Sequence, residues 1–313
     1  MLINFLLFVE IRTKLASVIP FLLGTCYALY RYESFSLMNT LIMFISLLTF
    51  DMATTAINNY FDYKKATKLN NGDAETSMAI VGGIAERHAR YIIFSLLTVA
   101  VTAGMTLVYH TDIMVFLVGA VSFLVGVFYT FGPVPLSRMP LGEVFSGFFM
   151  GFVIFFLAVY VHIFDLGIST IMLEGSRLIV TVNIVEIINI FLLSVPAMAG
   201  IANIMLANNI CDIDEDIINR RFTLPYYLGR DNSLSLFKAL YYIAYADILL
   251  IVILGLAPKL ISLCLLTLIP VQKNIRVFTD NPLKNSTFML SVQNFFLMNF
   301  THLIFLLLSI ALF

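Results

Sequence analysis

The sequence predicts an all-α integral membrane protein with about nine transmembrane helices, and composition and pattern both support this. Of the 313 residues, 60% are hydrophobic and only 12% are charged, and the mean hydropathy is +0.97. A soluble domain carries roughly 25% charged residues. The apolar runs are continuous rather than alternating, and lipid requires backbone polar groups to be satisfied internally. Helices are therefore the expected form.

Nine apolar segments are candidates to cross a bilayer, which takes about 17–25 residues each. They fall at 15–31, 37–57, 91–110, 112–131, 144–164, 187–207, 239–257, 259–272 and 291–313, and the eighth is the shortest. No Pro/Gly/Ser-rich linker or low-complexity stretch divides them. We therefore expect a single domain over residues 1–313.

The basic residues lie mostly on one side of these segments. With the N-terminus inside, the outer segments carry only Arg31, Arg177 and Lys259, and the inner segments carry the other 15 of the 18 Lys and Arg residues. This bias follows the positive-inside rule. It predicts that the long polar segments 58–90 and 208–238 are cytoplasmic and that 165–186 is the long outer loop. Without a basic domain face, a nucleic-acid partner is not expected.

A repeated pentapeptide stands where two apolar stretches give way to charge. It reads Asn58-Asn59-Tyr60-Phe61-Asp62 in the first copy and Asn208-Asn209-Ile210-Cys211-Asp212 in the second. The helical period places the polar residues of each copy on one stripe. The first stripe comprises Asp51, Thr55, Asn58 and Asp62, and the second comprises Asn208, Asp212 and Asp216. Asp214 and Glu215 lie off the stripe and are expected to face solvent.

Carboxylates at a membrane edge are costly and usually face a cavity or a partner. Mg²⁺ prefers oxygen ligands and is typically held by one or two carboxylates together with substrate phosphate. Two such stripes facing each other would hold a diphosphate through Mg²⁺. The alternative is that Asp62 and Asp212 are ordinary polar caps where helices leave the membrane.

Basic residues follow both clusters, and developing negative charge on a diphosphate is stabilised by fixed cations. They are Lys64, Lys65 and Lys68 after the first and Arg220 and Arg221 after the second. Lys65 and Arg221 are better placed than the others, although each basic residue is also a normal membrane anchor. Tyr129 and Glu143 flank a Gly/Pro turn and are candidates to face a cavity. The scattered cysteines and histidines argue against a histidine-built metal site.

Through these motifs the chain resembles the UbiA superfamily of intramembrane prenyltransferases. Within that superfamily it resembles the branch that prenylates 1,4-dihydroxy-2-naphthoate (the MenA type). The first family motif, N-D-x-x-D, often continues Y-F-D-Y-K-K-G-T-D in this branch, and here it spans residues 58–68. The second, N-N-x-x-D-x-x-x-D followed by a basic pair and T-L, spans residues 208–224. The turn Y-T-x-G-P-x-P-L from Tyr129 and the later G-E at 142–143 are also similar.

The resemblance implies nine helices around a central cavity open to lipid, with Mg²⁺ and diphosphate at a cytoplasmic cap. Asn58, Asp62, Asp212 and Asp216 would hold the metal, with the three aspartates essential to catalysis. Asn58, Asn208, Lys65 and Arg221 would bind the diphosphate, and Tyr129 and Glu143 would contact substrate. Three positions depart from the family pattern, namely Asn59 and Lys68 for aspartates and Phe222 for a basic residue. Asp73 or Glu75 would be the nearest compensating carboxylates.

The resemblance predicts Mg²⁺-dependent transfer of a polyprenyl group from an allylic diphosphate to 1,4-dihydroxy-2-naphthoate. CO₂ and diphosphate would be lost and demethylmenaquinol formed, in a step of menaquinone biosynthesis. The partners would be a polyprenyl diphosphate, the aromatic acceptor and membrane lipid, in a bacterial cytoplasmic membrane. Two alternatives stay open. One is a related prenyltransferase with another acceptor, such as 4-hydroxybenzoate or a haem precursor. The other is a non-catalytic transporter or binding protein that uses the same polar cavity.

Overall fold

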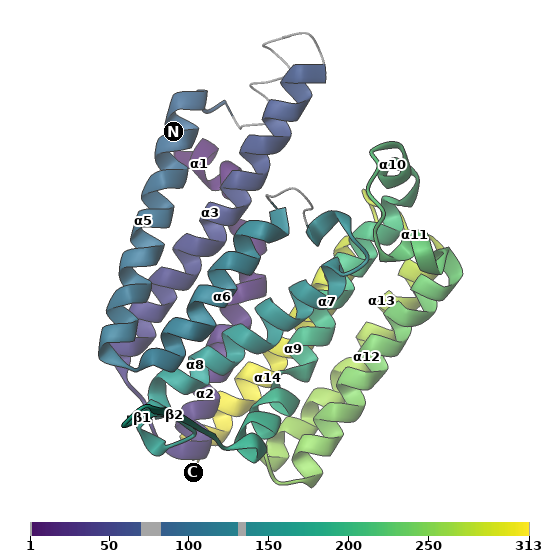
Figure 1. The fold of residues 1–313 in the computed structure, drawn as a ribbon. Helices are drawn as coiled ribbons and strands as arrows, with labels where there is room; N and C mark the ends of the chain where they lie inside the picture. Colours follow the sequence, from purple (N-terminus) through teal and green to yellow (C-terminus); the bar gives the residue numbers. More distant parts are fainter. Residues whose placement is uncertain (1, 70–82, 131–135, 313) are drawn as a thin grey trace. The chain divides into compact units, whose positions relative to one another are not determined.

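The computed structural model of the chain describes residues 2–69, 83–130 and 136–312 (Figure 1). The chain packs as two compact units. Unit 1 comprises Met1–Val18 and Leu37–Pro135, and unit 2 comprises Ile19–Ser36 and Leu136–Phe313. The expectation of a single domain over residues 1–313 stays a prediction.

Unit 1 is built on a pair of long helices. Its elements are α1 (Leu2–Phe8), η1 (Ile11–Lys14), the start of α2 (Leu15–Tyr32), α3 (Leu37–Leu69), α5 (Glu86–His110) and α6 (Ile113–Thr130). Helix α3 packs along α5. At the α1 end the core is formed by Phe8, Val9, Met52, Ala56 and Ala89, all buried. This cluster anchors the N-terminal segment against α3, the helix that carries the first polar cluster.

Unit 2 places α9 at its centre, in contact with most of its other helices. After the rest of α2, its elements are η2 (Leu136–Arg138), α7 (Gly142–Ser146), η3 (Gly147–Val153), α8 (Ile154–Ile163), η4 (Phe164–Leu166), β1 (Ser169–Glu174), β2 (Arg177–Val182), α9 (Ile184–Cys211), α10 (Ile213–Ile218), α11 (Leu224–Leu228), α12 (Arg230–Ile253), η5 (Lys259–Thr267), α13 (Leu268–Asp280) and α14 (Met289–Leu312). The second polar cluster lies at the junction of α9 and α10.

Small residues let α9 approach its neighbours closely. The segment Gly147–Val153 is a π-helix within the span 142–166. A Cβ atom built on Gly151 would lie 2.5 Å from the Cα atom of Met198 on α9, and one on Gly147 would lie 2.9 Å from the Met198 carbonyl oxygen. Close contact at small residues is a common basis for helix packing in membranes. Glycine is therefore required here by space.

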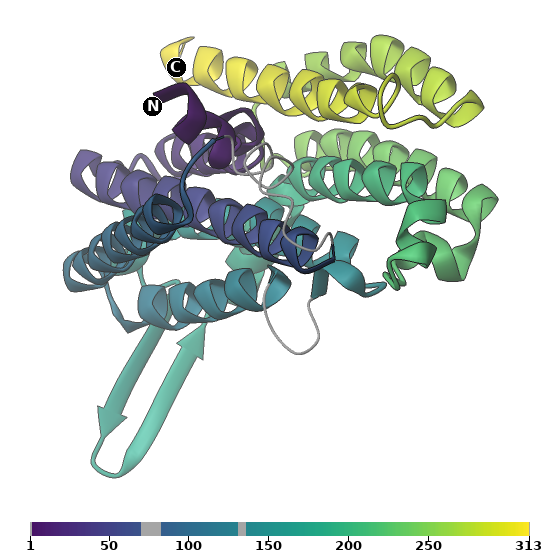
Figure 2. The same ribbon diagram turned by 90° about the horizontal axis from the view of Figure 1, so that it is seen from above.

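The segment between α8 and α9 contains a feature that the sequence did not predict. Strands β1 and β2 pair antiparallel, with Ser169 opposite Val182 and Glu174 opposite Arg177. Figure 2 shows this hairpin as a two-stranded ribbon that extends away from the helices. The sequence predicted a loop at 165–186 but not its two strands. An all-α membrane pattern gives no expectation for the structure of a segment between spans.

The predicted spans agree closely with the observed helices. Among the described residues, eight helices are long and apolar enough to cross a membrane, at 11–32, 37–61, 86–110, 142–166, 184–211, 230–253, 259–280 and 289–312. A ninth apolar helix, Ile113–Tyr129, is shorter. A predominantly helical membrane architecture is therefore confirmed, whereas the exact count of nine is not. The segment that seemed shortest, 259–272, extends to Asp280 because η5 continues directly into α13.

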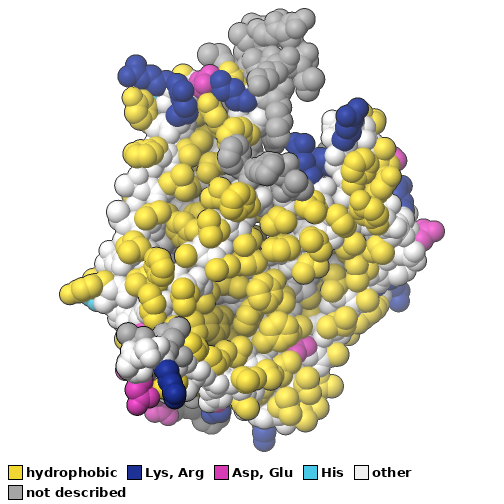
Figure 3. All heavy atoms as spheres, viewed as in Figure 1, with side chains coloured by type: hydrophobic (Ala, Val, Ile, Leu, Met, Phe, Trp, Pro, Cys, Tyr) yellow, Lys and Arg dark blue, Asp and Glu magenta, His cyan; other side chains and the backbone are white. Residues whose placement is uncertain are grey.

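The surface has the character expected for a protein in lipid. Figure 3 shows hydrophobic side chains over most of the visible face, with Lys and Arg mainly near its edges. Large apolar residues such as Phe94, Ile253 and Ile269 are each more than 70% exposed. Apolar exposure on this scale is unfavourable in water and favourable in a bilayer. The chain is an integral membrane protein.

Candidate active site

The first polar cluster lies on α3, which continues without a break beyond the apolar segment 37–57, through the predicted helical stripe that ends at Asp62, and on to residue 69. Asn58 is exposed on this helix. Asp62 and Lys65 belong to the same helix, but their side chains lie outside the described part of the structure, as does that of Lys68. The carboxylates Asp73 and Glu75 also lie outside it. The assigned roles of these residues stay predictions.

Asn59, which stands where the family motif has an aspartate, has a clear structural use. Its Nδ2 atom donates hydrogen bonds to the carbonyl oxygen of Phe8 at 2.9 Å and to Oε1 of Glu10 at 3.2 Å. A carboxylate at this position has no proton to donate and would face two acceptors. The amide therefore ties the end of α1 to α3, which gives the departure a physical reason.

Lys64 is engaged with a neighbouring helix. Its Nζ atom lies 2.8 Å from Oε1 of Glu86, the first residue of α5, and the same oxygen accepts a hydrogen bond from the hydroxyl group of Tyr60 at 3.1 Å. The hydrogen bond to Glu86 raises the pKa of Lys64 above its ordinary value. The role of Lys65 as a phosphate ligand stays a prediction.

Two members of the first stripe, Asp51 and Thr55, contact the buried side chain of Lys14. The sequence reasoning missed this ion pair between Lys14 and Asp51. The Lys14 side chain is only 4% exposed, and its Nζ atom lies 2.7 Å from Oδ1 of Asp51 and 2.5 Å from Oγ1 of Thr55. Ser17 donates to the other Asp51 oxygen, Oδ2, at 2.5 Å. One signal was available, because an isolated aspartate in an apolar run requires a partner.

The second cluster keeps its helical spacing across a break. Asp212 ends α9 and precedes α10, with φ −99° and ψ 5°. The backbone amide of Asp212 still donates to the Asn208 carbonyl at 3.1 Å, and that of Asp216 donates to the Asp212 carbonyl at 2.8 Å. The two i→i+4 hydrogen bonds hold Asn208, Asp212 and Asp216 in sequence along one stripe. Asp214 and Glu215 are exposed, as predicted.

A lysine far along the chain contacts two members of this stripe. Nζ of Lys284, in the loop between α13 and α14, lies 2.5 Å from Oδ2 of Asp212 and also donates to Oδ1 of Asn208. The Nδ2 atom of Asn208 donates to the same Asp212 oxygen at 3.2 Å. The amide oxygen and the carboxylate therefore converge on one cation. Sequence reasoning gave Lys284 no role beyond membrane anchoring.

Asp216 is the most enclosed carboxylate of the cluster. It is 3% exposed, with Oδ1 lying 3.4 Å from Nε of Arg221 and Oδ2 accepting a hydrogen bond from the hydroxyl group of Thr223 at 3.3 Å. Burial raises the pKa of Asp216 above its ordinary value, and the Arg221 charge opposes this rise. Arg221, predicted as a phosphate ligand, is thus placed beside a predicted metal ligand.

Glu143 and Asn209 form a buried pair beside the cluster. Nδ2 of Asn209 donates to Oε1 of Glu143 at 2.8 Å, and the two residues are 1% and 3% exposed, respectively. Among the described residues, Oε2 of Glu143 and Oδ1 of Asn209 have no hydrogen-bond partner. Helix α7 therefore presents Glu143 to the α9 segment that carries the motif. Tyr129, the other predicted substrate contact, is half-buried near the end of α6 in unit 1.

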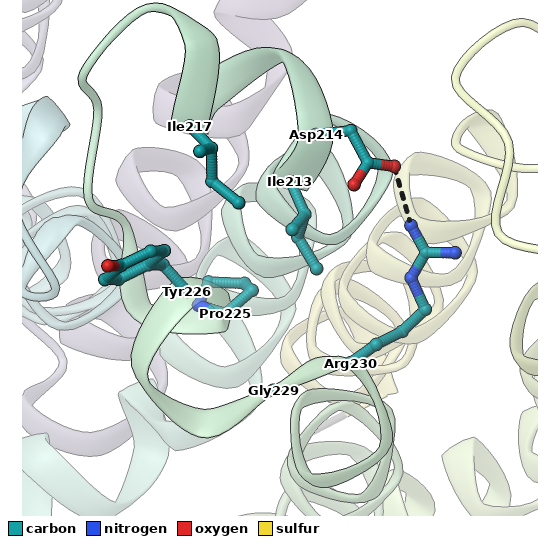
Figure 4. Close-up of a pocket in the computed structure, with 7 residues that line it drawn as sticks. All are labelled: Ile213, Asp214, Ile217, Pro225, Tyr226, Gly229 and Arg230. Carbon is teal, nitrogen blue, oxygen red and sulfur yellow. Dashed lines mark ion pairs between the residues drawn. The ribbon is translucent and has the colours of Figure 1, made fainter.

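A pocket of about 400 Å³ opens next to the second cluster but does not include its stripe. It is lined by Ile213, Asp214, Ile217, Pro225, Tyr226, Gly229 and Arg230. Figure 4 shows Asp214 paired with Arg230, whose Nη2 atom lies 3.6 Å from Oδ2 of Asp214. Because Asp212 and Asp216 do not line this pocket, it is not the candidate site.

The donor set of the second cluster fits a hard divalent cation. Asn208, Asp212 and Asp216 supply amide and carboxylate oxygens, which Mg²⁺ prefers. The Lys284 ammonium already bridges two of these oxygens, so the site attracts positive charge. Within the described ranges, no group of three His, Cys, Asp or Glu residues is arranged to hold a metal.

Solved structures share this architecture. A UbiA homolog from Archaeoglobus fulgidus bound to DMAPP and Mg²⁺ superposes with a TM-score of 0.65 at 13% identity, covering 99% of this chain and 100% of that one. The apo structure of a UbiA homolog from Aeropyrum pernix K1 gives a TM-score of 0.63 at 19% identity, covering 90% and 96% of the two chains. At these identities the likeness establishes the fold.

Sequence comparison extends the relationship. The chain is 28% identical over 276 residues to the 1,4-dihydroxy-2-naphthoate octaprenyltransferase of Bacillus subtilis (strain 168), covering 86% of this chain and 80% of that protein. The UbiA prenyltransferase family matches residues 17–301, which include both polar clusters. With a match over most of its length, the chain belongs to the UbiA prenyltransferase family and is a prenyltransferase.

Proposed function

We propose that this enzyme transfers a polyprenyl group from an allylic diphosphate to 1,4-dihydroxy-2-naphthoate, with Mg²⁺ as cofactor. CO₂ and diphosphate leave, and demethylmenaquinol forms. The single observation that carries the acceptor is the similarity, over 86% of the chain, to a relative named for that acceptor. The oxygen-rich stripe of Asn208, Asp212 and Asp216 supports the cofactor.

The proposed site residues have two tasks, metal binding and diphosphate binding. Asn58, Asp62, Asp212 and Asp216 hold the metal, and Asn58, Asn208, Lys65 and Arg221 bind diphosphate. Bound Mg²⁺ supplies positive charge that stabilises the departing diphosphate. Arg221 adds a fixed cation to the same task, since its guanidinium lies next to Asp216. The contribution of Asn58, Asp62 and Lys65 is assigned from their positions in the first motif.

Binding of the aromatic substrate is assigned to the buried pair of Glu143 and Asn209. Oε2 of Glu143 and Oδ1 of Asn209 are hydrogen-bond acceptors without a donor in the described structure, and the hydroxyl groups of a dihydroxynaphthoate are donors. Glu143 orients the ring through such a bond, and Tyr129 is a second substrate contact. The C1–oxygen bond of the prenyl diphosphate breaks, the electron-rich ring attacks C1, and the carboxyl group leaves as CO₂. A site without water protects the allylic cation from hydrolysis.

The proposed setting is a bacterial cytoplasmic membrane with both polar clusters on the cytoplasmic side. The exclusion of 15 of 18 basic residues from the predicted outer segments supports this orientation. Both the prenyl donor and the product are lipids, so a membrane enzyme suits the reaction. The product would serve menaquinone biosynthesis.

The test is a prenyl-transfer assay on purified protein in nanodiscs with Mg²⁺, farnesyl diphosphate and 1,4-dihydroxy-2-naphthoate, read by mass spectrometry. The expected product is a prenylated naphthoquinol that lacks the carboxyl group, and EDTA should abolish it. Parallel reactions contain 4-hydroxybenzoate in place of the naphthoate. Transfer to 4-hydroxybenzoate alone would replace the acceptor while keeping the reaction class. Loss of transfer with every acceptor, in folded protein, would contradict the proposal.

A further inference from the structure

The backbone of the loop that carries Lys284 is held by hydrogen bonds beside the second cluster. Lys284 lies in the short loop between α13 and α14, where the hydroxyl group of Thr287 accepts a hydrogen bond from the Leu283 amide at 2.8 Å and donates to the Asn281 carbonyl at 2.7 Å. Thr287 is 8% exposed. Because these bonds fix the loop backbone, the position of the Lys284 ammonium depends on its own side-chain torsions.

The Lys284 ammonium contacts the same oxygens that are proposed to bind diphosphate and metal. It donates to Oδ1 of Asn208 and lies 2.5 Å from Oδ2 of Asp212, two oxygens that the proposed function assigns to diphosphate and metal. An ammonium cannot coordinate a metal ion, and two cations within contact distance repel each other. A divalent cation that binds Oδ2 of Asp212 therefore competes with Lys284 for that oxygen.

The Lys284 ammonium stays close to the second cluster when a metal ion displaces it from Asp212. The Lys284 side chain is 43% exposed, so it moves without disrupting a packed core. Its Nζ atom also lies 5.3 Å from the centre of the Phe288 ring, which provides a second favourable contact at the same end of α14. The anion that arrives together with the metal is the diphosphate. A displaced ammonium at the edge of the site is positioned to donate to its oxygens.

We propose that Lys284 is a diphosphate-binding residue that neutralises Asp212 when no metal is bound and transfers its hydrogen bonds to the diphosphate when metal and substrate arrive. This inference rests on the proposed function and adds a residue to its site. It assigns Lys284 two opposite effects. Lys284 competes with the metal alone, and it stabilises the metal–diphosphate complex.

The first experiment measures metal affinity without substrate. Mn²⁺ is titrated into purified protein, and free Mn²⁺ is followed by electron paramagnetic resonance. Lys284→Ala should bind Mn²⁺ roughly tenfold more tightly than the wild type, because the competing ammonium is gone. Lys273→Ala removes the same charge from an exposed position on α13 and should leave the affinity within twofold. Unchanged or weaker Mn²⁺ binding by Lys284→Ala would overturn the competition.

The second experiment measures binding of a non-reactive prenyl thiolodiphosphate at saturating Mg²⁺ by isothermal titration calorimetry. Lys284→Ala should bind the analogue roughly tenfold more weakly, and Lys284→Arg should retain most of the affinity. If Lys284 had a purely structural role, Lys284→Ala would weaken the binding of both Mn²⁺ and the analogue. Unchanged analogue binding by Lys284→Ala would overturn the phosphate contact. If the wild type binds neither Mn²⁺ nor the analogue, the proposed function fails instead, so the two failures are distinguishable.

Discussion

The amide of Asn209 donates to the carboxylate of Glu143 across 2.8 Å, and both side chains are buried. This bond joins α7 to the segment of α9 that carries the second polar cluster. Asn209 immediately follows Asn208, a member of the stripe, and precedes Asp212 by three residues. A pair of this kind fixes the orientation of the motif helix from the side, independently of any contact with substrate.

Replacement of Glu143 tests this orientation. Glu143→Ala leaves the Asn209 amide buried without an acceptor, which should cost about 1–3 kcal/mol of unfolding free energy. Glu143→Gln keeps the Oε1 acceptor and should unfold close to the wild-type temperature. Thermal unfolding of the purified proteins in detergent provides the measurement. Equal unfolding temperatures for the alanine variant and the wild type would argue against a positioning role.

The second stripe predicts a contrast between neighbouring aspartates. Asp212→Ala and Asp216→Ala should each lower kcat/KM for prenyl transfer by roughly 10²-fold or more, because each removes a group assigned to transition-state stabilisation. Asp214→Ala is the matched control, since its side chain is 87% exposed and faces Arg230 instead. Steady-state kinetics measures the contrast, after gel filtration has shown that all three variants are folded. Similar losses in all three would contradict the stripe.

The buried pair of Lys14 and Asp51 should be important for stability. Lys14→Met leaves the partly buried Asp51 carboxylate without its cation. Breaking a fully buried ion pair typically costs about 3–5 kcal/mol, so a loss at the lower end of that range is expected. The double variant Lys14→Met/Asp51→Leu removes both charges and should recover much of the loss. Thermal unfolding of the single and double variants completes a mutant cycle. A double variant no more stable than Lys14→Met would show that the ion pair is not the cause.

Packing between η3 and α9 gives a prediction based on space alone. Gly151→Ala places a Cβ atom 2.5 Å from the Met198 Cα atom, a backbone contact that no rotamer relieves. We expect destabilisation of about 1–3 kcal/mol from overpacking. Gly119→Ala on α6 is the matched control, because nothing lies within 4 Å of its Cβ position. Unfolding temperatures compare the two, and an equally small effect in both would contradict the close approach.

The sequence by itself determined the membrane class, the approximate limits of the spans and the two polar clusters. Each depends on local pattern: the length of an apolar run, or a helical spacing of three and four residues. Asp216 could be distinguished from Asp214 in the same way, and burial confirmed the difference. The extension of α3 beyond Asp62 to Leu69 and the β-hairpin were not predicted, since neither changes the hydropathy pattern by which spans are found.

Only the tertiary structure decided which charged groups meet. Lys14 reaches Asp51 across 37 residues of sequence, and Lys284 reaches Asp212 across 72. Asn59, noticed in the sequence as a missing carboxylate, proved to be an amide donor to Phe8, 51 residues away. Helical periodicity states which residues share a face of one helix, but it does not state which helix packs against that face. Side-chain partners at long sequence separation are therefore set by packing.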